Sequence, residues 1–151
     1  MDVSGVKVAI LGGIGVVGSV IAEVFGGWDA AMITLVTLMI IDYIMGILVA
    51  AVWHKSPKSE SGTLESRAGW KGLCRKGVIL LIVLIGARLD ILLGTSNIVR
   101  NAAIIGYSAN ELISVVENAG LMGVPIPSIV QKAIDVLQKK AEGGEDDAKG
   151  D

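Results

Sequence analysis

Apolar residues fall into four long blocks, separated by two short polar turns and one long polar segment. The second block has 24 residues and carries a single charge, Asp42. As a helix it is about 36 Å long, which is enough to cross a hydrocarbon layer of ~30 Å with some tilt. The fourth block mixes apolar and polar residues at helical spacing. The pattern predicts an all-α, polytopic membrane protein whose transmembrane helices cover residues 6–25, 30–53, 77–94 and 101–122.

The remaining segments are polar. Residues 54–76 contain Pro57 and six basic residues, so we expect a loop there. After Gly123, Pro127 suits the first turn of a further helix. Apolar residues then recur at i, i+3, i+4 spacing with charges opposite them, which predicts an amphipathic helix followed by a charged, disordered tail. The chain thus divides into a transmembrane domain (1–122) and a C-terminal part (123–151).

Glycines are concentrated in the first apolar block. Gly13, Gly15 and Gly18 imitate the G-x-G-x-x-G fingerprint of dinucleotide-binding proteins. However, the next block is far longer than a strand, and no alternation of strands and helices follows. A cleaved signal peptide also fits poorly, because the A-x-A site is missing and more spans follow. In a membrane helix Gly12, Gly15 and Gly18 instead form a small-residue face that allows close packing in an oligomer.

Basic residues are distributed unevenly among the connections. The 54–76 segment holds six and the 26–29 turn holds none, so the positive-inside rule places the former in the cytoplasm. Four spans with both termini in the cytoplasm put eleven of the thirteen basic residues inside. In a three-span alternative, 101–122 lies on the outer surface and four lysines are outside. The polarity of that segment leaves both topologies open.

Composition excludes several kinds of protein. The net charge of -2 gives no sign of a nucleic-acid-binding surface. With one cysteine, Cys74, and one histidine, His54, the chain has no internal disulfide, no Cys/His cluster with metal spacing and few possible nucleophile–base pairs. We therefore expect no metal, no cofactor and no enzymatic activity.

Three charges are expected at one depth in the bilayer. Asp42, Arg88 and Glu111 each lie 11 residues from the inner end of their span, about 16 Å along the helix, and Asp90 lies nearby. An isolated charge there costs about 2.5–3.5 kcal/mol on insertion scales, so these side chains should face one another. The working hypothesis is an Asp42–Arg88 ion pair, with Glu111 neutral or in contact with water.

Two helix faces carry the candidate pore-lining or helix-packing residues. Asp42, Gly46 and Ala50 form a stripe small enough for another helix to approach closely. The fourth block has a polar stripe that requires protein or water rather than lipid. At this point the stripe can equally join helices in a static bundle or line a water-filled path. Its members are Tyr107, Asn110, Glu111, Ser114, Glu117 and Asn118.

Three stretches resemble the toxin-secretion/phage-lysis holin family of bacteriophages. Residues 40–50, "IIDYIMGILVA", match a D-x-x-x-G-x-x-x-A span of that family. Residues 66–76, "SRAGWKGLCRK", are similar to its basic cytoplasmic loop. Residues 110–127, "NELISVVENAGLMGVPIP", match its N-E-x-(L/I)-S-x-x-E-N run and are the most specific of the three. The 55–66 part of the loop looks longer than in the family, and the acidic tail matches no motif.

The resemblance implies a holin that accumulates in the cytoplasmic membrane of the bacterial host. It implies as partners the lipid bilayer, further copies of the chain and, functionally, an endolysin or a toxin that the lesion releases. The family contributes no catalytic residues. A small ion-channel or transporter subunit and an antiholin-type regulator are the alternatives. The resemblance gives weight to Asp42, Gly46, Asn110, Glu111, Ser114, Glu117 and Asn118.

Overall fold

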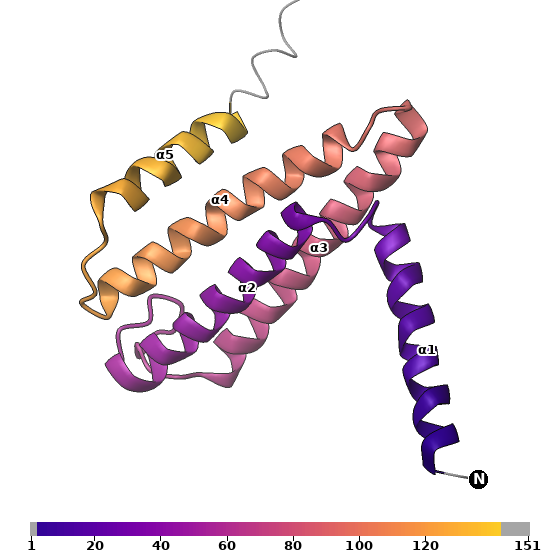
Figure 1. Ribbon diagram of the computed structural model, residues 1–151. Coiled ribbons are helices and arrows are strands. Elements are labelled where there is room, and N and C mark those ends of the chain that lie inside the picture. The colour runs from indigo at the N-terminus through magenta and orange to yellow at the C-terminus, as the bar shows by residue number, and fades with distance from the viewer. Residues whose placement is uncertain (1–2, 143–151) are drawn as a thin grey trace, which may run out of the picture.

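The structure is a computed structural model, which describes residues 3–142. This part of the chain contains helices and no strand, which confirms the all-α prediction. Helix α2 is extended by a π-helical segment, η1 (Figure 1). The predicted disordered tail, 143–151, lies outside the described residues. The helices are α1 (Val3–Val24), α2 (Ala30–Leu48), η1 (Val49–Trp53), α3 (Ser66–Leu93), α4 (Ile98–Leu121) and α5 (Ser128–Glu142).

Helices α2, α3 and α4 pack side by side as an antiparallel bundle (Figure 1). Met32, Leu35 and Met39 of α2 meet Val83 of α3 and Ile104 of α4 in a buried apolar core. The buried residues of α2 recur at spacings of three and four, which places them on one face of a helix. This face is the one that α2 turns toward α4.

Helix α1 stands away from this bundle (Figure 1). None of its residues is buried, and among the described helices it contacts only α3. Two described stretches are long and apolar enough to cross a membrane, namely α1 and the continuous helix Ala30–Trp53. An apolar helix exposed on all sides is suited to lipid or to contact with other apolar helices rather than to water.

Helix α3 begins eleven residues earlier than the third predicted span, which corrects the prediction of a loop over 54–76. The segment from Ser66 to Lys76 is helical, and the loop is confined to 54–65. Arg and Lys are good helix formers, and their side chains extend from the helix without interrupting its hydrogen bonds. The basic residues between Ser66 and Lys76 were therefore not evidence of a loop.

Helix α5 confirms the predicted amphipathic helix after Pro127. It runs beside α4 (Figure 1), and Ile134 is its buried residue. Lys139 and Lys140 lie in its last turn, where a positive charge interacts favourably with the partial negative charge of a helix C-terminus.

Candidate functional site

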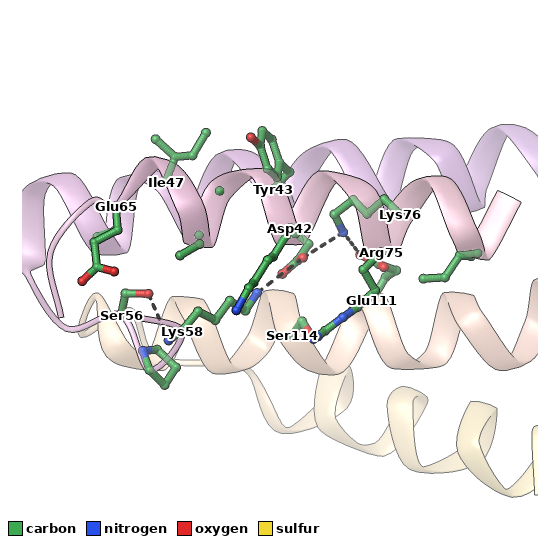
Figure 2. Close-up of a pocket in the computed structure, with 18 of the residues that line it drawn as sticks. Asp42, Tyr43, Ile47, Ser56, Lys58, Glu65, Arg75, Lys76, Glu111 and Ser114 are labelled. Atoms are coloured by element: carbon green, nitrogen blue, oxygen red, sulfur yellow. Dashed lines mark hydrogen bonds and ion pairs between the residues drawn. The ribbon is translucent and has the colours of Figure 1, made fainter. Parts of the chain in front are cut away.

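Four polar side chains meet inside the α2–α3–α4 bundle, and we call them the Lys76 cluster. The Lys76 Nζ atom of α3 donates to Asp42 Oδ2 of α2 at 2.9 Å and also to Glu111 of α4. Asn118 of α4 donates from Nδ2 to Asp42 Oδ1 at 3.0 Å. Asp42, Glu111 and Asn118 are buried, and the side chain of Lys76 is 12% exposed. One lysine thus links two carboxylates from different helices, as Figure 2 shows.

The spacing of residues along each helix places these groups on the faces that pack together. On α4, Ile104, Glu111 and Asn118 lie seven residues apart, so they share the face that packs on α2 and α3. On α3, Lys76 and the buried Val83 and Asp90 have the same spacing. The Lys76 cluster therefore directly continues the apolar core. Such buried charges require partners, because unpaired ones cost several kcal/mol each.

The Lys76 cluster forms part of the wall of a cavity of about 820 Å³. Helices α2, α3 and α4 and the 54–65 loop all contribute to the lining. Lys58 from the loop approaches Asp42 Oδ2 to 4.0 Å, and Ser56 lies on the same side (Figure 2). This lining combines charged and hydroxyl groups at one end with apolar groups such as Ile79 and Ile82.

A second set of polar groups occupies the opposite end of the bundle, and we call it the Arg100 cluster (Asp29, Asp90 and Arg100). The Arg100 side chain of α4 is 0% exposed. It donates twice to the Asp29 carboxylate, at 2.8 and 3.3 Å, and to the carbonyls of Phe25 and Gly27, at 2.6 and 2.7 Å. The Arg100 cluster thereby fixes the turn between α1 and α2 to the first turn of α4.

Asp29 has two functions in this turn. Its side chain accepts from the backbone N–H of Met32 and so caps the N-terminus of α2. The hydrogen bond from Arg100 holds the pKa of the Asp29 carboxyl below its usual value, and the Met32 N–H acts in the same direction. Gly26 adopts a φ of +75° beside them, where a Cβ would lie 3.2 Å from Arg100 Cδ.

Asp90 lies in the Arg100 cluster rather than at mid-depth in the bundle. It accepts from the backbone N–H groups of Val99 and Arg100, at 2.9 and 2.8 Å, and from the Thr95 hydroxyl. A carboxylate from α3 thus caps the first turn of α4, whose own N-cap residue, Asn97, makes no side-chain cap. Its role in the fold is to join the ends of two helices.

The predicted Asp42–Arg88 ion pair is wrong. Asp42 pairs with Lys76, and Arg88 donates instead to the backbone carbonyls of Glu23 and Val24 at the end of α1. Arg88 lies twelve residues beyond Lys76, about 18 Å along α3. The prediction aligned the ends of the spans at Gly77, whereas α3 begins at Ser66 and its register against α2 is correspondingly shifted.

The other predicted site residues divide among the cavity, the solvent-facing surface and α1. Gly46, Asn110 and Ser114 line the cavity, and no atom lies within 4 Å of a Cβ built on Gly46. Glu117 is exposed. The glycines proposed for oligomer packing have no neighbour within 4 Å of a built Cβ, because α1 is separate from the bundle. These glycines are Gly12, Gly15 and Gly18.

Sequence reasoning missed Lys76, Arg100 and Asp29 as site residues. Lys76 was counted among the cytoplasmic basic residues, and the other two were assigned to turns. Val83 and Asp90 lie seven residues apart, and the position seven residues before Val83 is Lys76. In the same way, i, i+4 spacing before Ile104 reaches Arg100. The signal that could have identified both was a basic residue at a position that the helical spacing assigns to the buried face.

Metal chemistry has no support in the described residues, which contain no group of three or more His, Cys, Asp or Glu side chains that could hold a metal ion. The residues that meet here are cations, carboxylates and amides in hydrogen-bonded contact. This arrangement joins the helices to one another.

Comparisons with known proteins identify the family of the chain. The sequence profile of the bacteriophage holin family matches residues 19–139. An uncharacterised protein of Listeria monocytogenes is 37% identical over 134 residues, covering 89% of each chain. An uncharacterised 14.9 kDa protein of Clostridium perfringens is 35% identical over 129 residues, covering 85% of this chain and 92% of its own. A probable holin of Bacillus phage phi105 is 29% identical over 104 residues, covering 69% and 71%.

No solved structure matches the chain. The profile match covers most of the sequence, including the Lys76 and Arg100 clusters. Proteins of this family permeabilise membranes and are not enzymes. The chain therefore belongs to the bacteriophage holin family, which makes it a membrane protein without enzymatic activity.

Proposed function

We propose that the chain is a holin that assembles with copies of itself in the cytoplasmic membrane of a bacterial host. The resulting lesion releases an endolysin or a toxin and thereby sets the time of lysis. Besides the family, the observation that carries the proposal is the Lys76 cluster, in which two buried carboxylates and a largely buried lysine meet inside a bundle of helices.

A buried ionic cluster suits a protein with two states. While the bundle is closed, every described buried side-chain polar atom has a hydrogen-bond partner, so the polar groups are hidden from lipid at a low cost. When helices separate within an assembly, the same groups become hydrated. Because exposure to lipid would cost several kcal/mol per charge, separation occurs only where the groups gain water or a neighbouring chain. Asn110 and Ser114, beside Glu111 at the cavity, extend this hydrophilic surface.

The proposed topology has four spans and both termini in the cytoplasm. Helix α4 packs against both α2 and α3, which supports the four-span arrangement over one in which 101–122 lies on the membrane surface. The Arg100 cluster is then at the outer face, and the 54–65 loop and the start of α5 are at the inner face. Gly12, Gly15 and Gly18 of α1 provide the contact between chains.

Endolysin release tests the proposal directly. The chain is expressed in bacteria together with a cytoplasmic endolysin, and culture density and membrane potential are followed. Wild type should lyse the culture abruptly, and Glu111→Leu and Asp42→Leu should shift the time of lysis at equal membrane accumulation. Lys55→Leu, in the exposed loop, is the control and should leave the timing unchanged.

Two alternatives predict different results in that experiment. A small ion channel or transporter subunit would change the membrane potential without releasing the endolysin. An antiholin-type regulator expressed alone would neither change the membrane potential nor release the endolysin. Expressed with a second holin, it would delay the lysis that this holin causes. Normal timing in both leucine variants would remove the Lys76 cluster from the mechanism.

A further inference from the structure

The cavity beside the Lys76 cluster contains two cations without a partner in the described chain. Lys76 is satisfied by two carboxylates, and Lys58 lies 4.0 Å from Asp42. Lys71 and Arg75, on successive turns of α3, also line the cavity; both are exposed residues, and neither forms an ion pair with a described residue. The nearby Glu65 instead accepts from Ser61 Oγ at 2.8 Å. The two side chains are thus available to an anion.

The cavity also has an apolar wall. Val78, Ile79 and Ile82 of α3 line the part that lies further along α3 from Lys71. A volume of about 820 Å³ is within the range of sites that bind small molecules. Cations at one end and branched apolar side chains at the other fit an amphiphile with an anionic head, rather than a wholly polar anion.

The depth of these residues in the bilayer indicates which kind of amphiphile fits the cavity. This step rests on the orientation given under the proposed function, in which Asp90 is at the outer face. Counting along α3 from Asp90, Arg75 and Lys71 lie about 22 Å and 28 Å further in. A hydrocarbon layer of ~30 Å therefore ends close to Lys71, at the phosphate groups of the inner leaflet. Long basic side chains extend readily toward that level.

We propose that this cavity binds the headgroup of an anionic phospholipid of the inner leaflet. Lys71 and Arg75 hold the phosphate by charge-assisted hydrogen bonds, and an acyl chain lies along Val78, Ile79 and Ile82. Basic pockets between membrane helices on the cytoplasmic side have the charge and the position for such lipids. The guanidinium of Arg75 can bind two phosphate oxygens at once.

Lipid binding to the purified full-length chain tests this inference. The chain in a neutral detergent is titrated with phosphatidylglycerol or phosphatidylcholine, and bound lipid is counted by native mass spectrometry. The test variant is Lys71→Gln with Arg75→Gln. The control is Lys55→Gln with Arg67→Gln, which removes the same charge from exposed residues outside the cavity lining. Circular dichroism compares the folding of both, and Lys71→Gln alone is the fallback should the double variant unfold.

We expect one phosphatidylglycerol per chain, bound more tightly than phosphatidylcholine. At roughly fivefold per removed charge, the test variant should lose about 25-fold in affinity, Lys71→Gln alone about fivefold, and the control less than twofold. Equal loss in test and control variants, or equal binding of the two lipids, would overturn the inference. Displacement by inorganic phosphate would also overturn it, since the site would then take a soluble anion. Lysis is not measured, so failure of endolysin release alone would contradict only the proposed function.

Discussion

Lys76 and Arg100 illustrate two ways in which a membrane protein accommodates a buried cation. Arg100 satisfies its guanidinium with one carboxylate and two backbone carbonyls, so it is bound within a rigid turn. Lys76 has two carboxylates from different helices, Asp42 and Glu111. A guanidinium with fixed geometry suits a permanent joint, whereas a flexible ammonium can remain with one partner as the other moves. We infer that the Lys76 cluster changes during assembly and that the Arg100 cluster persists.

Removing the cation of the Lys76 cluster should destabilise the bundle. Lys76→Met leaves Asp42 and Glu111 buried without a positive partner, and breaking such a pair costs about 3–5 kcal/mol. Unfolding in detergent, followed by circular dichroism, measures the loss. Adding Asp42→Asn and Glu111→Gln to the Lys76→Met variant should restore most of the lost stability. Lys55→Met is the exposed control, and a Lys76→Met effect no larger than that of the control would contradict the prediction.

The turn between α1 and α2 should loosen in acid. Arg100 lowers the pKa of Asp29, so the ionised form stabilises the folded turn above the unfolded pKa of about 3.9. This contribution is lost as the pH falls from that value through the lower, folded pKa. Trp28 adjoins Asp29 and is exposed, so its fluorescence, with Trp53 and Trp70 replaced by Phe, reports the change. In the Asp29→Asn variant, the fluorescence change between the unfolded and the folded pKa should be absent. An unchanged fluorescence transition would exclude Asp29 as its origin.

At the scale of the helices, α1, α2, α4 and α5 were predictable and α3 was predictable in part. Long apolar runs and i, i+3, i+4 spacing located these four helices within a few residues. The start of α3 was missed because hydropathy marks where a helix meets lipid, and not where the helix begins. That error moved the level assigned to Arg88 by several turns and produced the wrong ion pair. Asp42 and Glu111 were expected at one depth because both lie well inside apolar segments, and Lys76 contacts both. Glu111 is buried and forms an ion pair with Lys76, whereas the hypothesis had it neutral or in contact with water.

The close approach of α3 and α4 gives a prediction at this scale. A Cβ on Gly86 would lie 3.1 and 3.2 Å from the Arg100 Cα and N atoms, which are backbone and cannot move independently. Gly86→Ala should therefore push the helices apart and cost about 1–3 kcal/mol. Gly77→Ala, in the same helix with no atom within 4 Å, should instead stabilise by about 0.5–1 kcal/mol. Thermal unfolding in detergent compares the two, and equal effects would contradict the packing described here.

At the scale of the whole molecule, polar groups lie in two layers with apolar packing between them. Asp29 and Asp42 are thirteen residues apart and Lys76 and Asp90 fourteen, so the layers are about 20 Å apart along the helices. This is less than the ~30 Å of a hydrocarbon core. With the Arg100 cluster at the outer face, the Lys76 cluster and its cavity extend into the inner half of the bilayer. The apolar barrier of a single chain is thus thinner than the membrane around it.

The orientation of the chain can be tested with single cysteines in a Cys74→Ser background. We expect a cysteine at Ser96 to react with a membrane-impermeant maleimide in intact cells, because the α3–α4 turn is placed outside. Cysteines at Ser61 and Ser128 should react only after the membrane is broken. Labelling at Ser128 in intact cells would instead support the three-span topology.

The separation of α1 from the bundle has a kinetic consequence. This helix is attached at its end, where Arg88 binds the carbonyls of Glu23 and Val24 and Arg100 binds the carbonyl of Phe25 just after the helix, and none of its residues is buried against the bundle. Two copies that meet in the plane of the membrane can therefore associate through α1 without first breaking an internal interface. The frequency of such encounters rises with the square of the number of copies per unit area. Under the proposed function, a chain synthesised at a steady rate would therefore meet copies of itself rarely at first and at a rate that grows with the square of the elapsed time.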